Sequence, residues 1–457
     1  MDSGSNTALA AAGRERGGDR LSRLGDTVLG HILSFLPSTE AARAATLSRR
    51  WRHVFAAVHT LWSHESEDPL AMGYQWWKPR GDSPGPGDNS VPDDTQYVTP
   101  RSLFSCAALG ALRLGSCWLD LPSAIALPFL DTLHLTRVDG RTGAVQRLVS
   151  ACPRLADLTL EACFYLTEIS IVDARLRRLA LQCCHNLAAV AVAVASSELR
   201  AFEYRGPVLG PSFLTLHGPR AKVSFCTIDL CGAEQADQPA LASLAGFLRL
   251  FVCVERLHLT SARLGSGVGH AHHPSSAVHT CNWECVFGHG SISSTLELPS
   301  FPALSNLELT GMLPDDDTLT ITAVTRIPQR TPSLDTLSLF FFPEPIPVRE
   351  NGHWYRHLDE EGLHAAHKLR YNQHARLAVP PDVEIPACLT ERTKEINLVH
   401  YQGAMAQRAL AKFLLCNAPA VDEVYCEFAP GPLLMQTKLM AEVKEWVMNK
   451  SANMTFF

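Results

Sequence analysis

The sequence predicts an α/β fold: three short helices at the N-terminal end, then a curved solenoid with a parallel sheet, then an α/β cap at the C-terminal end. Three observations lead to this prediction. Helical spacing marks residues 19–62, a leucine pattern recurs from residue 109, and strand and helix patterns alternate after residue 388. With 457 residues, of which 46% are hydrophobic, the chain has enough apolar material for a large core and more than one structural unit.

The N-terminal helical block is indicated by capping residues and apolar spacing. Asp26 is a good N-cap, and apolar residues follow it at helical spacing until Pro37 ends the run. Ser38 or Thr39 can cap a second helix, and Ser48 a third that has one apolar face. Three short helices bury too little surface to be stable alone, so we expect this block to need a partner.

The string DRLSRLGDTVLGHILSFLPSTEAARAATLSRRWRHVF resembles a plant F-box, although Gly25 stands where that family usually has proline. The resemblance implies docking to a Skp-type adaptor and, through it, to a cullin. Residues 20–62 hold six arginines against Asp26 and Glu40, an excess of four positive charges that suits an acidic adaptor. We expect the adaptor contact to use Leu21, Leu24, Leu29, Ile32, Leu33, Leu36, Pro37, Leu47 and Trp51.

From residue 109 the chain repeats the pattern apolar-x-x-apolar-x-apolar. Successive copies start at residues 109, 130, 155, 176 and 199, and so lie 21, 25, 21 and 23 residues apart. That period is typical of leucine-rich repeats, in which each unit supplies one strand to a curved parallel sheet. Strands are expected near residues 112–114, 133–135, 158–160, 179–181, 257–259, 307–309 and 337–339.

Two further features recur with the leucines. Cys117, Cys163 and Cys184 each stand three residues after the last leucine of a copy, where the repeat needs a small buried side chain. The stretch Gly143–Ser150 between two copies has the pattern of an outer helix. We therefore interpret these cysteines as structural rather than as nucleophiles or ligands.

The C-terminal segment, residues 388–457, resembles the FBD domain that follows the repeats in many plant F-box proteins. The matching text is KEINLVHYQGAMAQRALAKFLLCNAPAVDEVYCEF and GPLLMQTKLMAEVKEWVMNKSAN. The residue pattern predicts a strand at Ile396 and Leu398, a helix, a strand at Val421 and Val424, and a last helix opened by Pro432. Such a unit would close the open end of the repeat sheet.

The predicted organisation has five parts. Residues 1–18 are disordered, 19–62 form the F-box, 63–100 a linker or disordered loop, 101–387 the leucine-rich repeats, and 388–457 the FBD-like cap. The repeats are interrupted by insertions near 265–295 and 343–385, and insertions in a solenoid often carry the binding function.

Recognition of a target could use the sheet or the insertions. The residues between the last two leucines form a mixed row without a dominant charge or an aromatic stripe: Arg113, His134, Thr159, Ala180, Glu203, His258, Glu308 and Ser338. The insertions hold aromatic and arginine side chains, which dominate interface energies. Our hypothesis is that they bind the target through Trp283, Phe287, Arg349, Trp354, Tyr355 and Arg356; the alternative is that they are disordered decorations.

Composition and motifs argue against several other functions. The formal net charge of −6 disfavours a nucleic-acid binder, and the longest apolar run is too short for a membrane helix. We find no phosphate loop, HExxH or GxSxG motif, and we expect no cofactor and no catalytic residue. A cluster of His and Cys between residues 270 and 289 matches no standard zinc spacing, so a mobile loop is preferred to a metal site.

The resemblance to plant F-box proteins, together with the repeats, implies a non-catalytic, substrate-recognition subunit of a Skp–cullin–F-box ubiquitin ligase, which we expect in the nucleus or cytoplasm. The sequence leaves open a small-molecule receptor on the same repeats, and a scaffold that binds the adaptor without presenting a target. A metalloenzyme is a more distant alternative.

Overall fold

The computed structural model describes residues 29, 50, 60–63, 97–172, 175–193, 199–206, 212–217, 223–230, 246–263, 299–313, 320–342, 368–374, 377 and 383–457. Within the expected F-box, residues 19–62, these include only Leu29, Arg50 and residues 60–62. Leu29 and Arg50 are helical, and the Leu29 side chain is fully buried. The expected arrangement of three helices lies outside the described residues and stays a prediction.

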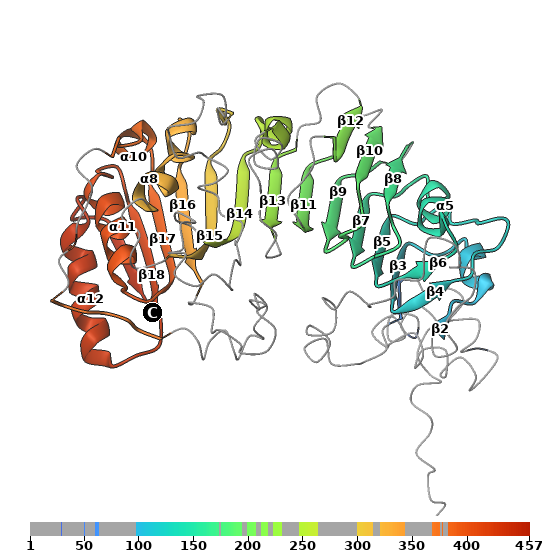
Figure 1. Ribbon diagram of the computed structural model, residues 1–457, viewed down its shortest axis with the longest axis horizontal. Helices are drawn as coiled ribbons and strands as arrows, with labels where there is room; N and C mark the ends of the chain where they lie inside the picture. Colours follow the sequence, from blue (N-terminus) through green and yellow to red (C-terminus); the bar gives the residue numbers. More distant parts are fainter. Residues whose placement is uncertain are drawn as a thin grey trace, which may run out of the picture.

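One long parallel sheet forms the body of the molecule, and its strands follow one another in an arc (Figure 1). Neighbouring strands are parallel throughout the 13 described strands of this sheet. In spatial order they are β1 (Thr60–Ser63), β3 (Ala111–Gly115), β5 (Thr132–Thr136), β7 (Asp157–Glu161), β9 (Arg178–Gln182), β11 (Ala201–Gly206), β13 (Phe225–Leu230), β14 (Arg256–Arg263), β15 (Asn306–Met312), β16 (Thr336–Phe341), β17 (Glu395–Tyr401), β18 (Glu423–Phe428) and β19 (Asn453–Phe456).

The leucine pattern sets the register of this sheet. Leu133 on β5 pairs with Leu112 on one side and with Leu158 on the other, so equivalent leucines stack from strand to strand. Burial alternates along β5, β11 and β16, as expected for strands with one face in a core. Each of the seven predicted repeat strands is confirmed, and the parallel sheet with it.

The chain turns after several strands at a residue in the left-handed region. Ser116, Arg137, Ala162 and Cys183 have φ between 49° and 53°. Each amide of these residues continues the ladder by donating to the next strand; Arg137 N–H, for example, donates to the Glu161 carbonyl at 2.8 Å. The residue after this corner points into the core. Cys117, Cys163 and Cys184 occupy this position, which accounts for their spacing.

Cys117, Cys163 and Cys184 are buried, as expected for this position. Their thiols tie repeats together: Cys163 Sγ lies 3.7 Å from the Leu135 carbonyl oxygen, and Cys184 Sγ lies 3.5 Å from that of Leu160. Burial raises the pKa of the Cys117 thiol to about 12, so the reactive thiolate is not formed at neutral pH. The interpretation of these thiols as structural agrees with this burial.

Two small parallel sheets accompany the large one and were not predicted. They consist of β2 (Tyr97–Val98), β4 (Cys117–Leu119) and β6 (Asp139–Gly140), and of β8 (Glu168–Ile171), β10 (Ala189–Ala193) and β12 (Leu214–His217). The helix expected at Gly143–Ser150 is present as α5 (Ala144–Ser150). After it, the return segments of the next repeats contain the strands β8, β10 and β12.

Helices pack on the leucine face of the sheet. They are α5, α8 (Thr320–Thr325), α10 (Ala387–Glu391), α11 (Met405–Cys416) and α12 (Leu433–Trp446), with 3₁₀ turns at Arg101–Ser105, Arg249–Phe251 and Pro328–Arg330. Leu148 of α5 and Leu410 of α11 belong to the same core cluster as the stacked leucines. The helices therefore cover one face, and the other face of the sheet, here called the open face, carries the polar side chains.

The C-terminal unit continues the sheet. β17, α11, β18 and α12 confirm the predicted strand–helix–strand–helix order, and α12 is opened by Pro432 as its N-cap. The strand β19 was not predicted. Because β17, β18 and β19 pair in parallel with β16 and with one another, the cap prolongs the open face instead of ending it.

An ion pair fastens the two helices of this unit. Arg408 on α11 donates to both oxygens of Glu442 on α12 at 3.0 and 2.8 Å, and Tyr371 donates to the same carboxylate at 2.6 Å. The Arg408 guanidinium also lies over the Tyr371 ring and donates to the Asn372 carbonyl. Only 4% of the Arg408 side chain is exposed, so this network is part of the interior.

Candidate functional site

The open face of the sheet is the candidate functional surface in the described part of the chain. The register places the residues between the stacked leucines in one continuous row. It comprises Arg113, His134, Thr159, Ala180, Glu203, Thr227, His258, Glu308, Ser338, Asn397, Tyr425 and Thr455. The eight positions predicted from sequence all lie in this row. Four more, Thr227, Asn397, Tyr425 and Thr455, complete it.

In the N-terminal half of the open face, charged side chains pair with one another. Arg178 on β9 binds Glu203 on β11 through two hydrogen bonds of 2.7 Å, and Arg205 Nε lies 3.3 Å from Asp229 Oδ2. Arg205 and Asp229 are direct partners in the register of β11 and β13, whereas Arg178 reaches Glu203 diagonally from β9 to β11; opposite charges in such positions stabilise a sheet. This half of the surface is therefore largely self-neutralised.

His134 and Glu161 form a second kind of pair in the same half. His134 Nε2 lies 3.6 Å from Glu161 Oε2, and Thr136 Oγ1 donates to that oxygen at 3.0 Å. Hydrogen bonding from His134, aided by Thr136, holds the pKa of the Glu161 carboxyl below its usual value, so this carboxylate is ionised at neutral pH.

His258 on β14 lies where the two halves meet. Its Nε2 is 3.1 Å from Glu308 Oε1 and 3.0 Å from the hydroxyl oxygens of Thr260 and Thr310. Burial lowers the pKa of His258 and outweighs the opposite effect of Glu308, so the imidazole is neutral at pH 7. His258 therefore brings no positive charge to Glu308 at neutral pH.

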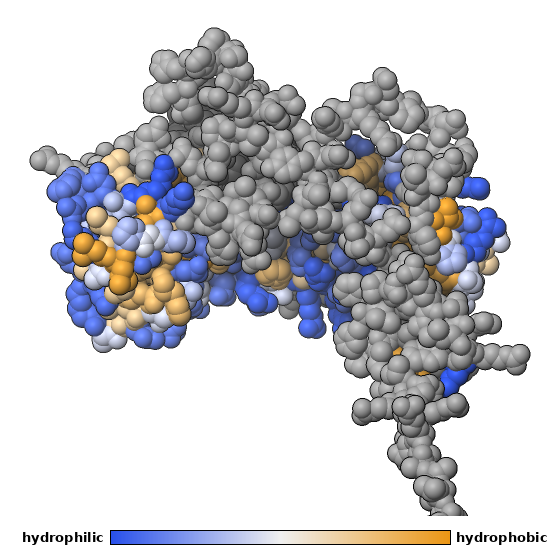
Figure 2. Space-filling view, turned by 90° about the horizontal axis from the view of Figure 1, so that it is seen from below, coloured by the Kyte–Doolittle hydropathy of each residue, from blue (hydrophilic) through white to orange (hydrophobic). Residues whose placement is uncertain are grey.

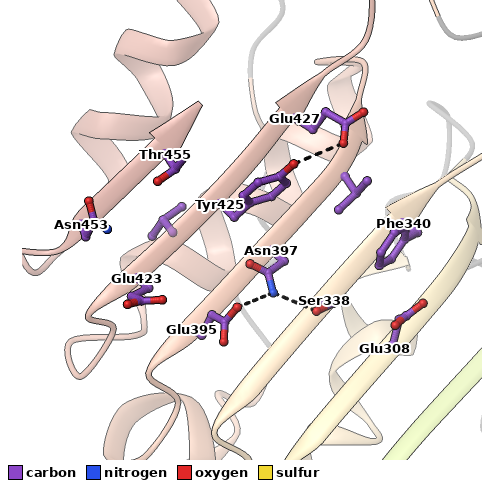
Figure 3. Close-up of a pocket in the computed structure, with 12 residues that line it drawn as sticks. Glu308, Ser338, Phe340, Glu395, Asn397, Glu423, Tyr425, Glu427, Asn453 and Thr455 are labelled. Atoms are coloured by element: carbon purple, nitrogen blue, oxygen red, sulfur yellow. Dashed lines mark hydrogen bonds between the residues drawn. The ribbon is translucent and has the colours of Figure 1, made fainter. Parts of the chain in front are cut away.

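The C-terminal half contains a depression of about 470 Å³, here called the acidic pocket. It spans β15 to β19 and is shown in Figure 3. Its lining residues are Glu308, Ser338, Phe340, Glu395, Asn397, Val399, Glu423, Val424, Tyr425, Glu427, Asn453 and Thr455. Four of these twelve residues are glutamates and none is lysine or arginine, so the lining has a formal charge of −4.

A hydrogen-bonded row fixes the centre of the acidic pocket. Asn397 Nδ2 donates to Glu395 Oε1 at 2.8 Å and to Ser338 Oγ at 3.0 Å, as the dashed lines in Figure 3 show. Thr336 donates to the other Glu395 oxygen at 3.1 Å. Both oxygens of Glu395 are thus held by donors, which gives the carboxylate a defined orientation before any partner arrives.

The aromatic part of the acidic pocket comes from Phe340 and Tyr425, both half-buried. The Tyr425 hydroxyl lies 3.5 Å from Glu427 Oε2, and the other oxygen of Glu427 lies 3.3 Å from His400 Nδ1. Partial burial and Glu427 raise the pKa of Tyr425, so the phenol stays protonated at neutral pH. The pocket therefore offers neutral aromatic rings beside carboxylates.

Most of the residues predicted to contact partners cannot be placed. Leu29 is described, and the other eight expected adaptor contacts lie outside the described residues. The same holds for all six expected target contacts and for the His/Cys cluster at 270–289. Among the residues that the structure does describe, no group of three His, Cys, Asp or Glu could hold a metal ion, and no helix is long and apolar enough to cross a membrane.

Comparisons with known proteins match two parts of the chain. Residues 21–62 match the model of the F-box domain, and residues 88–205, which include β2 to β11, match the leucine-rich repeats of an FBD-associated F-box protein. The first match lies within the predicted N-terminal block, residues 19–62, and the second covers the large sheet from β3 to all but the last residue of β11.

Similar proteins from Arabidopsis thaliana carry the same domain names. The chain is 28% identical over 206 residues to an FBD-associated F-box protein, an alignment that covers 36% of this chain and 50% of the relative. It is 28% identical over 188 residues to an F-box/LRR-repeat protein, covering 31% and 49%, and 27% identical over 186 residues to an F-box/FBD/LRR-repeat protein, covering 31% and 44%. The chain thus spans about half the length of the curated relatives it matches.

Proposed function

We propose that this plant F-box/leucine-rich-repeat protein, similar to the FBD-associated F-box proteins, is the substrate-recognition subunit of a Skp–cullin–F-box ubiquitin ligase. The observation that carries the proposal is that one chain combines a match to the F-box domain with a long repeat sheet. An F-box precedes a long sheet whose open face has no covering element among the described residues. One part attaches to the ligase, and the other is free to hold a target.

The attachment step rests on the F-box. Its apolar positions, from Leu21 to Trp51, are shared between packing of the small helices and contact with a Skp-type adaptor. The full burial of Leu29 on a helix fits a packing role within the block. The excess of arginines over acidic residues in 20–62 would speed encounter with an acidic adaptor and fix its orientation.

In this proposal the chain positions the target and takes no part in the chemical step of ubiquitin transfer. The cullin complex would bring a conjugating enzyme that carries ubiquitin as a thioester, and this chain would hold a target lysine near it. The gain in rate comes from proximity, since a bimolecular encounter becomes an event within one complex. A stiff scaffold is useful for this purpose, and a sheet whose apolar residues, many of them leucines, stack from strand to strand provides one. We place the complex in the nucleus or cytoplasm.

Two insertions remain candidates for target contacts in this proposal. The described chain stops at residue 263 at the end of β14 and at residue 342 just after β16. Both insertions therefore leave the sheet from strands next to β15, beside the acidic pocket. The predicted contacts Trp283, Phe287, Arg349, Trp354, Tyr355 and Arg356 would extend a surface that begins on the open face.

Affinity purification with mass spectrometry tests the proposal. We compare the full chain with a variant in which Leu36 and Pro37 are both alanine, with and without inhibition of the proteasome. The expected result is that adaptor and cullin accompany the native chain only, and that proteins which accumulate under inhibition bind both chains. Targets that bind without accumulating would support the alternative of a non-degradative scaffold, and co-purification of cullin with the variant would refute the docking assignment.

A further inference from the structure

Charge is distributed unevenly along the open face. In the N-terminal half, Arg178 and Arg205 neutralise Glu203 and Asp229 on the adjacent strands. Among the described residues that line the acidic pocket, none is lysine or arginine and four are glutamates. The N-terminal half of the open face therefore balances its own charges. The described lining of the acidic pocket, in the C-terminal half, carries negative charge that no lysine or arginine of that lining balances.

Two of the pocket glutamates lie directly beside each other. Glu395 on β17 and Glu423 on β18 are partners in the parallel register, so their side chains leave the same face of adjacent strands. Like charges on neighbouring strands cost stability. Glu423 is exposed, and its carboxylate makes no hydrogen bond or ion pair with the described residues, whereas both oxygens of Glu395 are oriented by Asn397 and Thr336. A pair of this kind is stabilised when a cation from another molecule lies between the carboxylates.

The surroundings of this glutamate pair suit an organic cation. Tyr425 follows Glu423 by two residues on β18 and so shares its face, and Phe340 lines the other side of the depression (Figure 3). An aromatic ring attracts a guanidinium or ammonium group over its face, and carboxylates bind arginine through paired hydrogen bonds. Among the described residues, no three carboxylate, histidine or cysteine side chains are arranged so that they could hold a metal ion. Rings and carboxylates together form the recognition chemistry of an arginine or lysine side chain.

The dimensions fit a segment of polypeptide. The acidic pocket spans five strands, β15 to β19, and strands lie about 4.8 Å apart, so it extends about 19 Å across the sheet. An extended chain covers that distance with about six residues. A segment of this length can place one basic side chain at the Glu395–Glu423 pair and another near Glu308 or Glu427.

We propose that the acidic pocket docks a basic segment of the protein target, with an arginine or lysine side chain between the Glu395–Glu423 pair and the Tyr425 ring. The inference rests on the proposed function, because it names the class of target segment that the recognition subunit takes. It assigns the described open face, in addition to the insertions, a direct part in recognition.

A labelled peptide of nine residues, with three arginines separated by glycine and serine, provides the probe. Its binding to the full chain is measured by fluorescence anisotropy, with a peptide that carries glutamate in place of arginine as the negative control. In the pocket variant, Glu395 and Glu423 are both glutamine. In the matched control, the exposed Glu391 on α10 and Glu445 on α12 are both glutamine, which changes the net charge by the same amount.

We expect the pocket variant to bind the arginine peptide about tenfold more weakly than the native chain, and the control variant to bind within about twofold. Tyr425→Leu, which removes the ring and leaves the four carboxylates, should weaken binding by about two- to fivefold, as loss of one exposed cation–π contact predicts. Binding to the native chain should weaken as salt is raised.

Three outcomes would overturn the inference: no binding of the arginine peptide to the native chain, peptide binding by the pocket variant that is no weaker than binding by the control variant, or equal affinity for arginine amide and for the peptide. The last result would assign the pocket to a small cationic molecule. Adaptor binding is measured on the same samples. Its loss in every sample would refute the proposed function, whereas its retention with unchanged peptide binding in the pocket variant would refute this inference alone.

Discussion

Replacement of Leu158 by alanine tests whether the stacked leucines hold the solenoid together. Leu158 is fully buried on β7, and its partners in the register are Leu133 on β5 and Leu179 on β9. Loss of the buried carbons removes about 2–3 kcal/mol of transfer free energy, at about 0.8 kcal/mol per methylene-sized group. Because hydrogen-bonded strands on both sides prevent collapse into the space, a cavity term adds to this, for a total of about 3–4 kcal/mol.

The free energy of unfolding is measured by urea denaturation followed by far-UV circular dichroism. Leu433→Ala is the matched control, because Leu433 on α12 is 77% exposed and the chemical change is the same. We expect the control to change the free energy by no more than about 0.5 kcal/mol. A loss for Leu158→Ala as small as that for Leu433→Ala would refute the assignment of the leucines to a packed core.

Three further predictions concern the described interior. Arg408→Ala should lower the free energy of unfolding by about 3 kcal/mol, because it leaves the Glu442 carboxylate without its main partner. Urea denaturation measures this loss. Replacing both Arg408 and Glu442 by apolar residues should restore much of the lost stability. Burial lowers the pKa of His258 in the folded state, so the unfolded state binds more protons than the folded state as the pH falls below about 6.5. The unmutated chain should therefore lose stability between pH 7.5 and pH 5.5, and His258→Gln should lose less. Melting temperatures of both proteins at the two pH values measure the difference. Cys253→Ser should remove a thiol that reacts rapidly with a disulfide reagent in the native state, because Cys253 is exposed, whereas Cys117→Ser should not change the number of fast-reacting thiols.

The repeat strands could be predicted from sequence because their physical cause is local. A leucine on either side of one polar residue satisfies the period of a strand, and recurrence every 21 to 25 residues requires the strands to stack in register. The small strands could not be found this way. Ala189–Ala193 alternates alanine and valine, and Glu168–Ile171 is only four residues long, so neither segment carries the repeated pattern of the main sheet.

The acidic pocket was missed for a different reason. The sequence predicts the row of open-face residues only as far as Ser338, where no charge dominates, because its pattern indicates a separate cap after the repeats. Since β17 and β18 continue the sheet, the row continues through Asn397 and Tyr425 and becomes acidic and aromatic there. The sequence did hold a sign of this continuity: Glu-Ile-Asn-Leu from Glu395 and Glu-Val-Tyr-Cys from Glu423 place an apolar residue on either side of a polar or aromatic one, as in the repeats.

Binding of the purified full chain to a purified Skp-type adaptor tests the central claim most directly. The native chain and the pocket variant with glutamine at 395 and 423 should bind the adaptor with equal affinity, because we propose that only the F-box contacts the adaptor. The variant with alanine at Leu36 and Pro37 should show no binding, while its circular dichroism spectrum still reports the folded sheet. Unchanged adaptor binding by that folded variant would contradict the account.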